Sequence, residues 1–181
     1  MKAITGHVVL MSLVGMLVSV PATGHATEDK VRELVWEDLM PKDWTPFDPW
    51  SDLTEEQINQ LSEGSAEEKR LMREYIEVKS SAPIVAALDG QRVRLPGYVV
   101  PLDYEGTEVS EFLLVPYFGA CIHVPPPPSN QIVFVKAEKT YSIDGIFAPV
   151  WVTGVLSTKA HLNLVGDAGY TLNATNVEPY Q

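Results

Sequence analysis

The sequence predicts a mainly β protein with helices near its N-terminus, whose main body is a small OB-like barrel of five or six strands. Helical apolar spacing and helix-capping motifs occur only before Pro83. After Pro83, short strand-like stretches are separated by glycines at positions 90, 97, 119, 154 and 169, which suit the bends and bulges of a curved sheet. A β-sandwich is the alternative architecture, because residues 83–178 are long enough for either fold.

Three helices are predicted in the N-terminal part. Residues 28–40 carry apolar side chains at helical spacing. Thr54-Glu-Glu-Gln57 and Ser65-Ala-Glu-Glu68 are capping boxes, which predict that two further helices begin there. The last helix continues to about Lys79, and its apolar positions recur every three or four residues, which predicts a buried stripe. The stripe consists of Leu71, Met72, Tyr75, Ile76 and Val78.

The strands of the barrel are predicted after Pro83. Ile84 to Leu88 and Gln91 to Leu95 flank Asp89-Gly90, a two-residue turn sequence, which predicts a β-hairpin. The second arm continues to Leu102 after a bend at Pro96-Gly97. Four more strands follow at Glu111 to Val115, Gln131 to Lys136, Pro149 to Leu156 and Gly169 to Val177. The 131–136 stretch does not alternate between apolar and polar residues, so it is predicted to be buried on both faces.

The first 26 residues have the features of a secretory signal peptide. Lys2 precedes an apolar run from Val8 to Val20, which is shorter than the about 20 residues of a membrane-spanning helix. Gly24-His25-Ala26 offers small residues at a cleavage site. We therefore expect a periplasmic protein with no membrane span after leader removal. Residues 27–82 would form a helical and aromatic-rich extension, and residues 83–181 the barrel domain; an uncleaved anchor is the alternative.

The charge of the chain narrows its classes of partner. Lys and Arg number 13 against 24 Asp and Glu, which gives a formal net charge of −11. Such a surface repels phosphate backbones, so nucleic-acid binding is not expected. It also disfavours electrostatic docking on anionic membranes. It is compatible with the attraction of cations.

The stretch from Phe118 to Asn130 holds the most unusual combination of residues. It contains the only cysteine, Cys121, with His123 two residues later and four prolines from 125 to 128. Consecutive prolines exclude a helix or a central strand and favour a stiff polyproline II segment, which we expect to be an exposed strut. Because one cysteine cannot form an intramolecular disulfide, Cys121 is buried, reactive, a metal ligand or an intermolecular bridge.

Metal binding is the first hypothesis for this stretch. Thiolate and imidazole are ligands that suit zinc or copper, and the two-residue spacing puts both on one face of an extended chain. Zinc requires three or four ligands, and His161 is the candidate for the third. Asp103, Asp144 or a second subunit are candidates for an oxygen ligand. The alternative is that Cys121 is a small buried hydrophobe and that the histidines are structural.

Two other classes of function remain open. In a non-catalytic interaction module of an envelope complex, Cys121 would be buried, and the prolines or the aromatic arm from Asp43 to Trp50 would dock a partner. In a thiol-dependent enzyme, His123 would activate Cys121, with Asn130 as an orienting residue. Cys/His pairs in enzymes normally come from distant segments, and no GxSxG, HExxH or paired CxxC motif occurs. The sequence therefore favours a protein that is not an enzyme.

Three stretches resemble DUF3299, a bacterial family catalogued only as a domain of unknown function. They are residues 93–102, residues 112–131 with the motif FGACIHVPPPPSNQ, and residues 150–156, and the similarity extends to Trp36–Pro41. The resemblance implies an exported envelope protein. Some members are similar to proteins encoded near ABC-type permeases and zinc-handling proteins, which implies an accessory role in metal handling or transport. It implies no reaction and singles out Cys121, His123 and the adjoining prolines.

Overall fold

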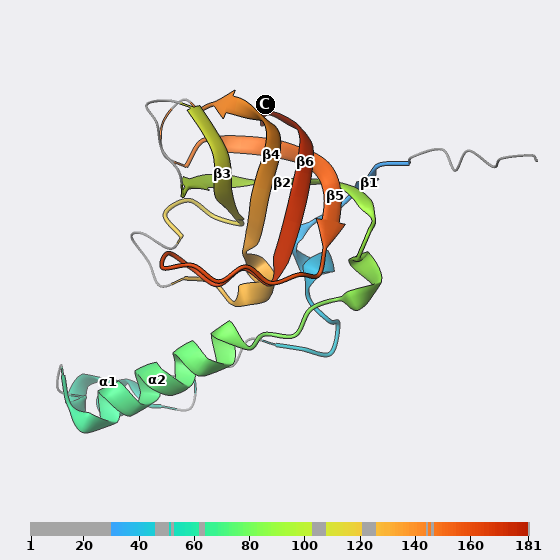
Figure 1. The fold of residues 1–181 in the computed structure, drawn as a ribbon. Coiled ribbons are helices and arrows are strands. Elements are labelled where there is room, and N and C mark those ends of the chain that lie inside the picture. Colours follow the sequence, from blue (N-terminus) through green and yellow to red (C-terminus); the bar gives the residue numbers. More distant parts are fainter. Residues whose placement is uncertain are drawn as a thin grey trace, which may run out of the picture.

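The computed structural model describes residues 30–45, 51, 53–61, 64–102, 108–120, 126–143, 145 and 147–180. Within these residues the main body is a closed barrel of five strands (Figure 1). The strands are β2 (Arg92–Pro101), β3 (Glu108–Val115), β4 (Val133–Ser142), β5 (Pro149–Ser157) and β6 (Tyr170–Pro179). Their order is β2-β3-β4-β6-β5, and β5 pairs back with β2 to close the sheet. The prediction of a small OB-like barrel is confirmed, and the β-sandwich alternative is wrong.

One parallel pair determines which loops meet. β4 and β6 run parallel, with Val133 paired to Tyr170, whereas the other neighbouring strands of the barrel are antiparallel. Parallel strands begin at the same end of a sheet, so the segments that lead into β4 and β6 meet at one end of the barrel. A hydrogen bond of 2.7 Å from the backbone N–H of Gly169 to the carbonyl of Ser129 joins these two segments.

Strand β2 is continuous through Pro96, and its partner changes along its length. Its residues up to Tyr98 pair with β5, and those from Tyr98 onwards pair with β3. Gly97 lies just before this change, where a Cβ atom would be 2.7 Å from the Leu114 side chain. Gly154 on β5 is tighter still, since a Cβ there would lie 2.2 Å from the carbonyl oxygen of Asn173. Both glycines therefore permit close contacts between neighbouring strands.

The predicted hairpin at Asp89-Gly90 is wrong. Residues Ala86–Leu88 form a 3-10 turn, η2, in place of a strand. Leu88 is buried in the core, and the N–H of Gly90 donates to the carbonyl of Leu156 at 2.8 Å. Asp89-Gly90 does form a turn, with Gly90 at φ 73°. However, residues 86–88 bury Leu88 in the core instead of pairing as a strand, because burial of this side chain outweighs strand propensity.

The predicted helix over residues 28–40 is also wrong for the residues that the structure describes. Arg32–Glu33 form the short strand β1, which pairs parallel to β2, and Trp36–Leu39 form a 3-10 helix, η1. Leu34 and Leu39 are fully buried in the barrel core. The apolar spacing thus reflects burial by an irregular segment. The proposed boundary at residue 83 stays a prediction, although residues 32–39 contribute to the barrel core.

Both capping-box helices are confirmed as α1 (Glu55–Gln60) and α2 (Ala66–Ser80). The hydroxyl oxygens of their N-caps Thr54 and Ser65 accept hydrogen bonds from the backbone N–H groups of the third helical residues. The buried stripe is confirmed only for Leu71, since Met72 and Ile76 are 39% and 56% exposed. Helix α2 extends away below the barrel, and only its C-terminal end comes close to it (Figure 1).

The leader lies outside the described residues, as do residues 46–50 of the aromatic arm. Within the described ranges, no helix combines the length and the apolar character that crossing a membrane requires.

Tyr170 joins the N-terminal segment to the barrel. Its side chain is fully buried, and its hydroxyl donates to the carbonyl of Leu39 at 2.8 Å while accepting from the N–H of Val85 at 2.6 Å. Burial raises the pKa of Tyr170, partly offset by the Val85 hydrogen bond. One phenol therefore connects β6 to η1 and to the segment before η2.

We predict that Tyr170→Phe lowers the free energy of unfolding by about 1–3 kcal/mol, because the Leu39 carbonyl and the Val85 N–H lose their partner. Urea unfolding measures this change. Tyr141→Phe is the matched control, since the Tyr141 hydroxyl has no hydrogen bond with the described residues and should cost little. Equal losses in both variants would contradict the role given to Tyr170.

The raised pKa of Tyr170 also predicts an alkaline instability. A folded-state pKa above the unfolded value of about 10 means that the stabilisation is complete below pH 10 and is lost as pH rises through the folded value. Urea unfolding as a function of pH should show a decline above about pH 10. The decline should be smaller in Tyr170→Phe, which has no proton to lose at this position.

Candidate functional site

Cys121 and His123 lie in residues 121–125, outside the described residues, but the structure fixes both ends of this loop. Ala120 precedes it and is fully buried. Of the prolines that follow, Pro126 is exposed, whereas Pro127 and Pro128 are buried. The predicted exposed strut is therefore wrong for these two prolines. Pro128 has φ −55° and ψ 150°, close to polyproline II geometry, as predicted.

His161 lies in the loop between β5 and β6, which meets the loop region before β4. Its backbone exchanges two hydrogen bonds of 2.9 Å with Ala168. Its imidazole stacks on the ring of Phe134, with ring centroids 3.7 Å apart and planes 8° from parallel. Phe134 and Ala120 belong to one hydrophobic cluster on the outside of the barrel, together with Ala168. The structure thus brings His161 to the cluster from which the Cys121 loop departs.

The imidazole of His161 contacts the described residues through its stack on Phe134. Stacking occupies the face of the imidazole and leaves its edge, which carries both nitrogens, free of that contact. The two hydrogen bonds between His161 and Ala168 come from the backbone and use neither ring nitrogen.

Asn130 carries an unused acceptor at the other end of the loop. It is fully buried, and its amide Nδ2 donates to the carbonyl of Pro83 at 2.8 Å. Among the described residues its Oδ1 has no hydrogen-bond partner, although it is buried. An unpaired buried acceptor is costly, so such an atom in a native protein marks a place where a donor is expected. From the sequence, Asn130 was a candidate only for the orienting residue of a thiol-dependent enzyme.

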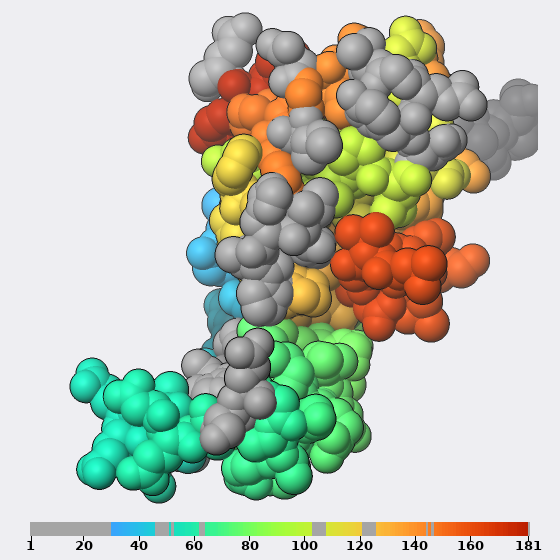
Figure 2. Space-filling model, turned by 90° about the vertical axis from the view of Figure 1, so that its left-hand side faces the viewer, coloured from blue at the N-terminus to red at the C-terminus, as the bar shows by residue number. Residues whose placement is uncertain are grey.

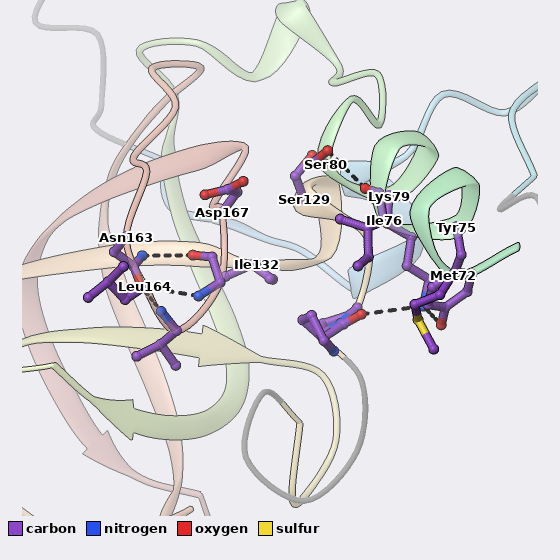
Figure 3. A pocket seen from close by; sticks show the side chains of 14 residues that line it. Met72, Tyr75, Ile76, Lys79, Ser80, Ser129, Ile132, Asn163, Leu164 and Asp167 are labelled. Atoms are coloured by element: carbon purple, nitrogen blue, oxygen red, sulfur yellow. Dashed lines mark hydrogen bonds between the residues drawn. The ribbon is translucent and has the colours of Figure 1, made fainter. Parts of the chain in front are cut away.

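A pocket of about 280 Å³ lies beside the prolines (Figure 3). Helix α2 supplies Met72, Ile76 and Lys79, and the β5–β6 loop supplies Leu164. Figure 2 shows α2 in green and this loop in orange-red on the same face of the molecule. Leu164 is fully exposed, and Lys79 reaches across to donate to the carbonyl of Pro126 at 3.3 Å. The exposed residues of the α2 stripe therefore line a pocket. Helical periodicity alone cannot distinguish apolar residues that line a pocket from apolar residues that are buried.

The conformation of the β5–β6 loop is held by Asn163. Its Oδ1 accepts hydrogen bonds from the N–H groups of Val165 and Gly166, at 2.9 and 3.1 Å, and its Nδ2 donates to the Gly166 carbonyl at 2.7 Å. These bonds form a tight turn directly after Leu162. They explain how a loop with two exposed leucines, Leu162 and Leu164, keeps a defined shape next to α2.

Comparison with known proteins identifies the family. The family model described as "Protein of unknown function (DUF3299)" matches residues 36–179. The chain belongs to the DUF3299 family. The predicted resemblance is therefore confirmed. Its barrel is also similar to the crystal structure of a DUF3299 family protein from Pseudomonas aeruginosa PAO1, at 39% sequence identity and a TM-score of 0.62. That match covers 84% of this chain and 97% of the other. No curated protein gives a significant match.

The metal site of this DUF3299 protein stays a prediction. Within the described ranges, no three His, Cys, Asp or Glu side chains are grouped so that they could hold a metal ion. Of the predicted ligands only His161 lies in these ranges, and the candidate oxygen donors Asp103 and Asp144 lie outside them. What the structure contributes is the position of His161 and the fixed ends of the loop.

We predict that His161→Ala lowers the free energy of unfolding by about 1 kcal/mol, because the stack on Phe134 is lost. His161→Phe retains an aromatic ring and should unfold at nearly the wild-type urea concentration. Denaturant unfolding of the two variants beside wild type measures both. If His161→Phe is the more destabilised of the pair, the stack does not hold this residue.

Proposed function

We propose that this DUF3299 protein is an exported periplasmic accessory protein that binds zinc or copper through Cys121, His123 and His161. The features of the first 26 residues support export. The observation that carries the metal proposal is the position of His161, stacked on Phe134 in the cluster that includes Ala120. His161 thus packs on a ring of the same hydrophobic cluster as Ala120, the residue before Cys121, and this supports the proposal.

The donor set suits the proposed ions. A thiolate and two imidazoles are ligands that zinc and copper prefer over the oxygen ligands of magnesium or calcium. Three protein ligands leave a position open on a four-coordinate ion, which suits an ion that is passed on to another protein. The net charge of −11 favours the approach of cations.

The buried side chain of Asn130 also supports the proposed metal site. Histidines that bind a metal through one ring nitrogen usually donate a hydrogen bond from the other nitrogen to an oxygen acceptor. The unpaired Oδ1 of Asn130 is a buried acceptor of this kind, located five residues after Pro125 and held in place through the Pro83 hydrogen bond. We assign to it the role of orienting a donor of the loop.

The partner in this proposal is a component of an ABC-type transport system or another envelope protein. The apolar side chains exposed beside the loop support it. Ile76 is 56% exposed and Leu164 fully exposed, and both line the pocket next to Pro126. Exposed apolar side chains grouped around a proposed metal site are typical of a surface that contacts another protein.

Metal content of the mature, untagged protein tests the proposal, because His123 and His161 are then the only histidines. Mass spectrometry after incubation with zinc or copper and gel filtration should find one ion per chain. Cys121→Ala and His123→Ala should bring the content close to zero. His161→Phe should do the same while keeping the wild-type stability, since it preserves the stack on Phe134 and removes only the nitrogens.

A second measurement and two possible results of the metal analysis decide whether the proposed site exists. Bound metal should slow alkylation of Cys121, the only thiol, and a chelator should restore the rate. A wild-type protein that takes up no metal would refute metal binding. Full metal content in His161→Phe would retain a site in the loop but remove His161 from the ligand set.

A further inference from the structure

Two neighbouring pockets form one groove that Pro127 separates from the pocket beside α2, since Pro127 lines both. Their volumes are about 470 and 230 Å³, and they share the residues Trp36, Pro96 and Pro116. Tyr117 and the buried prolines Pro127 and Pro128 line the larger pocket only, whereas Tyr98 and Tyr180 line the smaller one only. We call the two pockets together the aromatic groove. The shared residues form a ridge that divides it into two compartments.

The ridge is rigid. The indole Nε1–H of Trp36 donates to the carbonyl of Pro96 at 2.8 Å, which fixes the ring against β2. The carbonyl of Trp36 in turn accepts from the side-chain Nε2 of Gln131 at 2.9 Å. Pro96 and Pro116 have no freedom in φ. A ligand therefore finds this part of the groove preformed and loses little affinity to its ordering.

The groove has the chemistry that recognises polyproline II segments. Such segments are extended, have three residues per turn and keep their backbone solvated. They dock into grooves lined by aromatic rings, where their pyrrolidine rings enter successive compartments. Here four aromatic side chains line two compartments on either side of one ridge, and Tyr117 is 41% exposed while Tyr180 is 50% exposed.

Charge selects among proline-rich ligands. Among the described residues, Glu37 is the charged side chain that lines the groove. The nearby cation, Arg94, lies over the ring of Trp151 and pairs with Glu178 at 2.8 Å and Glu33 at 3.4 Å, so its charge is compensated. With a net charge of −11 on the chain, the groove favours a ligand that carries lysine or arginine beside its prolines.

We propose that the aromatic groove binds a proline-rich segment, flanked by lysine or arginine, of a partner protein. This inference rests on the partner part of the proposed function and supplies the chemistry of that partner. It uses none of the proposed metal ligands, so its failure and the failure of metal binding are separate results.

Calorimetric titration of the mature protein with a lysine-flanked oligoproline peptide tests the proposal. Wild type should bind it saturably. Tyr117→Ala should weaken binding about tenfold, which corresponds to about 1.4 kcal/mol. Leu164→Ala is the matched control, because Leu164 is fully exposed and lines the other pocket, and it should bind as wild type does.

A charge exchange tests whether Glu37 selects the charge of the residues that flank the prolines of the ligand. Glu37→Lys should weaken binding of the lysine-flanked peptide and strengthen binding of a glutamate-flanked oligoproline. Cys121→Ala should change neither affinity, whatever its metal content.

Four outcomes would overturn the proposal. The first is that wild type does not bind the peptide, and the second is that a lysine-flanked glycine–serine peptide binds equally well, which would mean that charge alone acts. The third is that wild type self-associates through Tyr117 in sedimentation, which would make a second copy the occupant. The fourth is that binding appears only in the double variant Pro46→Gly, Pro49→Gly, which would mean that the chain's own segment fills the groove.

Discussion

The pairing of β2 with β5 is the constraint on which the rest of the structure depends. It closes the sheet, so that each of the five barrel strands pairs with two other barrel strands. Closure in this order requires β4 and β6 to lie side by side and parallel. That parallel pair brings the segment with Ser129 against the β5–β6 loop with Gly169. The contact between the segments that precede β4 and β6 is thus a consequence of strand order rather than of local sequence.

The N-terminal segment from Arg32 to Leu39 contributes to the barrel core rather than forming a peripheral extension. Leu34 and Leu39 fill the core, and the carbonyl of Leu39 receives the buried Tyr170 hydroxyl. The same segment carries Trp36, whose position against β2 forms the ridge of the aromatic groove. The segment therefore has buried side chains that stabilise the barrel and an exposed side that forms part of the aromatic groove.

Local signals in the sequence were reliable where the structure depends on local interactions. The capping boxes at Thr54 and Ser65 marked two helix starts, because each is satisfied within one turn of chain. The strands from Glu111 onwards were predicted with ends within three residues of those of β3 to β6, except that β4 continues six residues beyond the predicted end at Lys136. Apolar spacing misled at residues 28–40 and on α2, since periodicity does not reveal what packs against a face. The stacking of His161 on Phe134 was beyond prediction, because it follows from the parallel pairing of strands distant in sequence.

The Tyr170–Leu39 hydrogen bond spans 131 residues, and this separation has a consequence for folding. Contacts between distant parts of a chain form slowly, because a long loop must close before they contribute any stability. Here the core takes Leu39 from near the start of the described residues and Tyr170, Leu172 and Ala174 from the last strand, β6. A nascent or partly emerged chain lacks β6 and has no means of closing the barrel. Closure of the barrel is therefore a late step of folding, which requires β6 as well as the N-terminal segment.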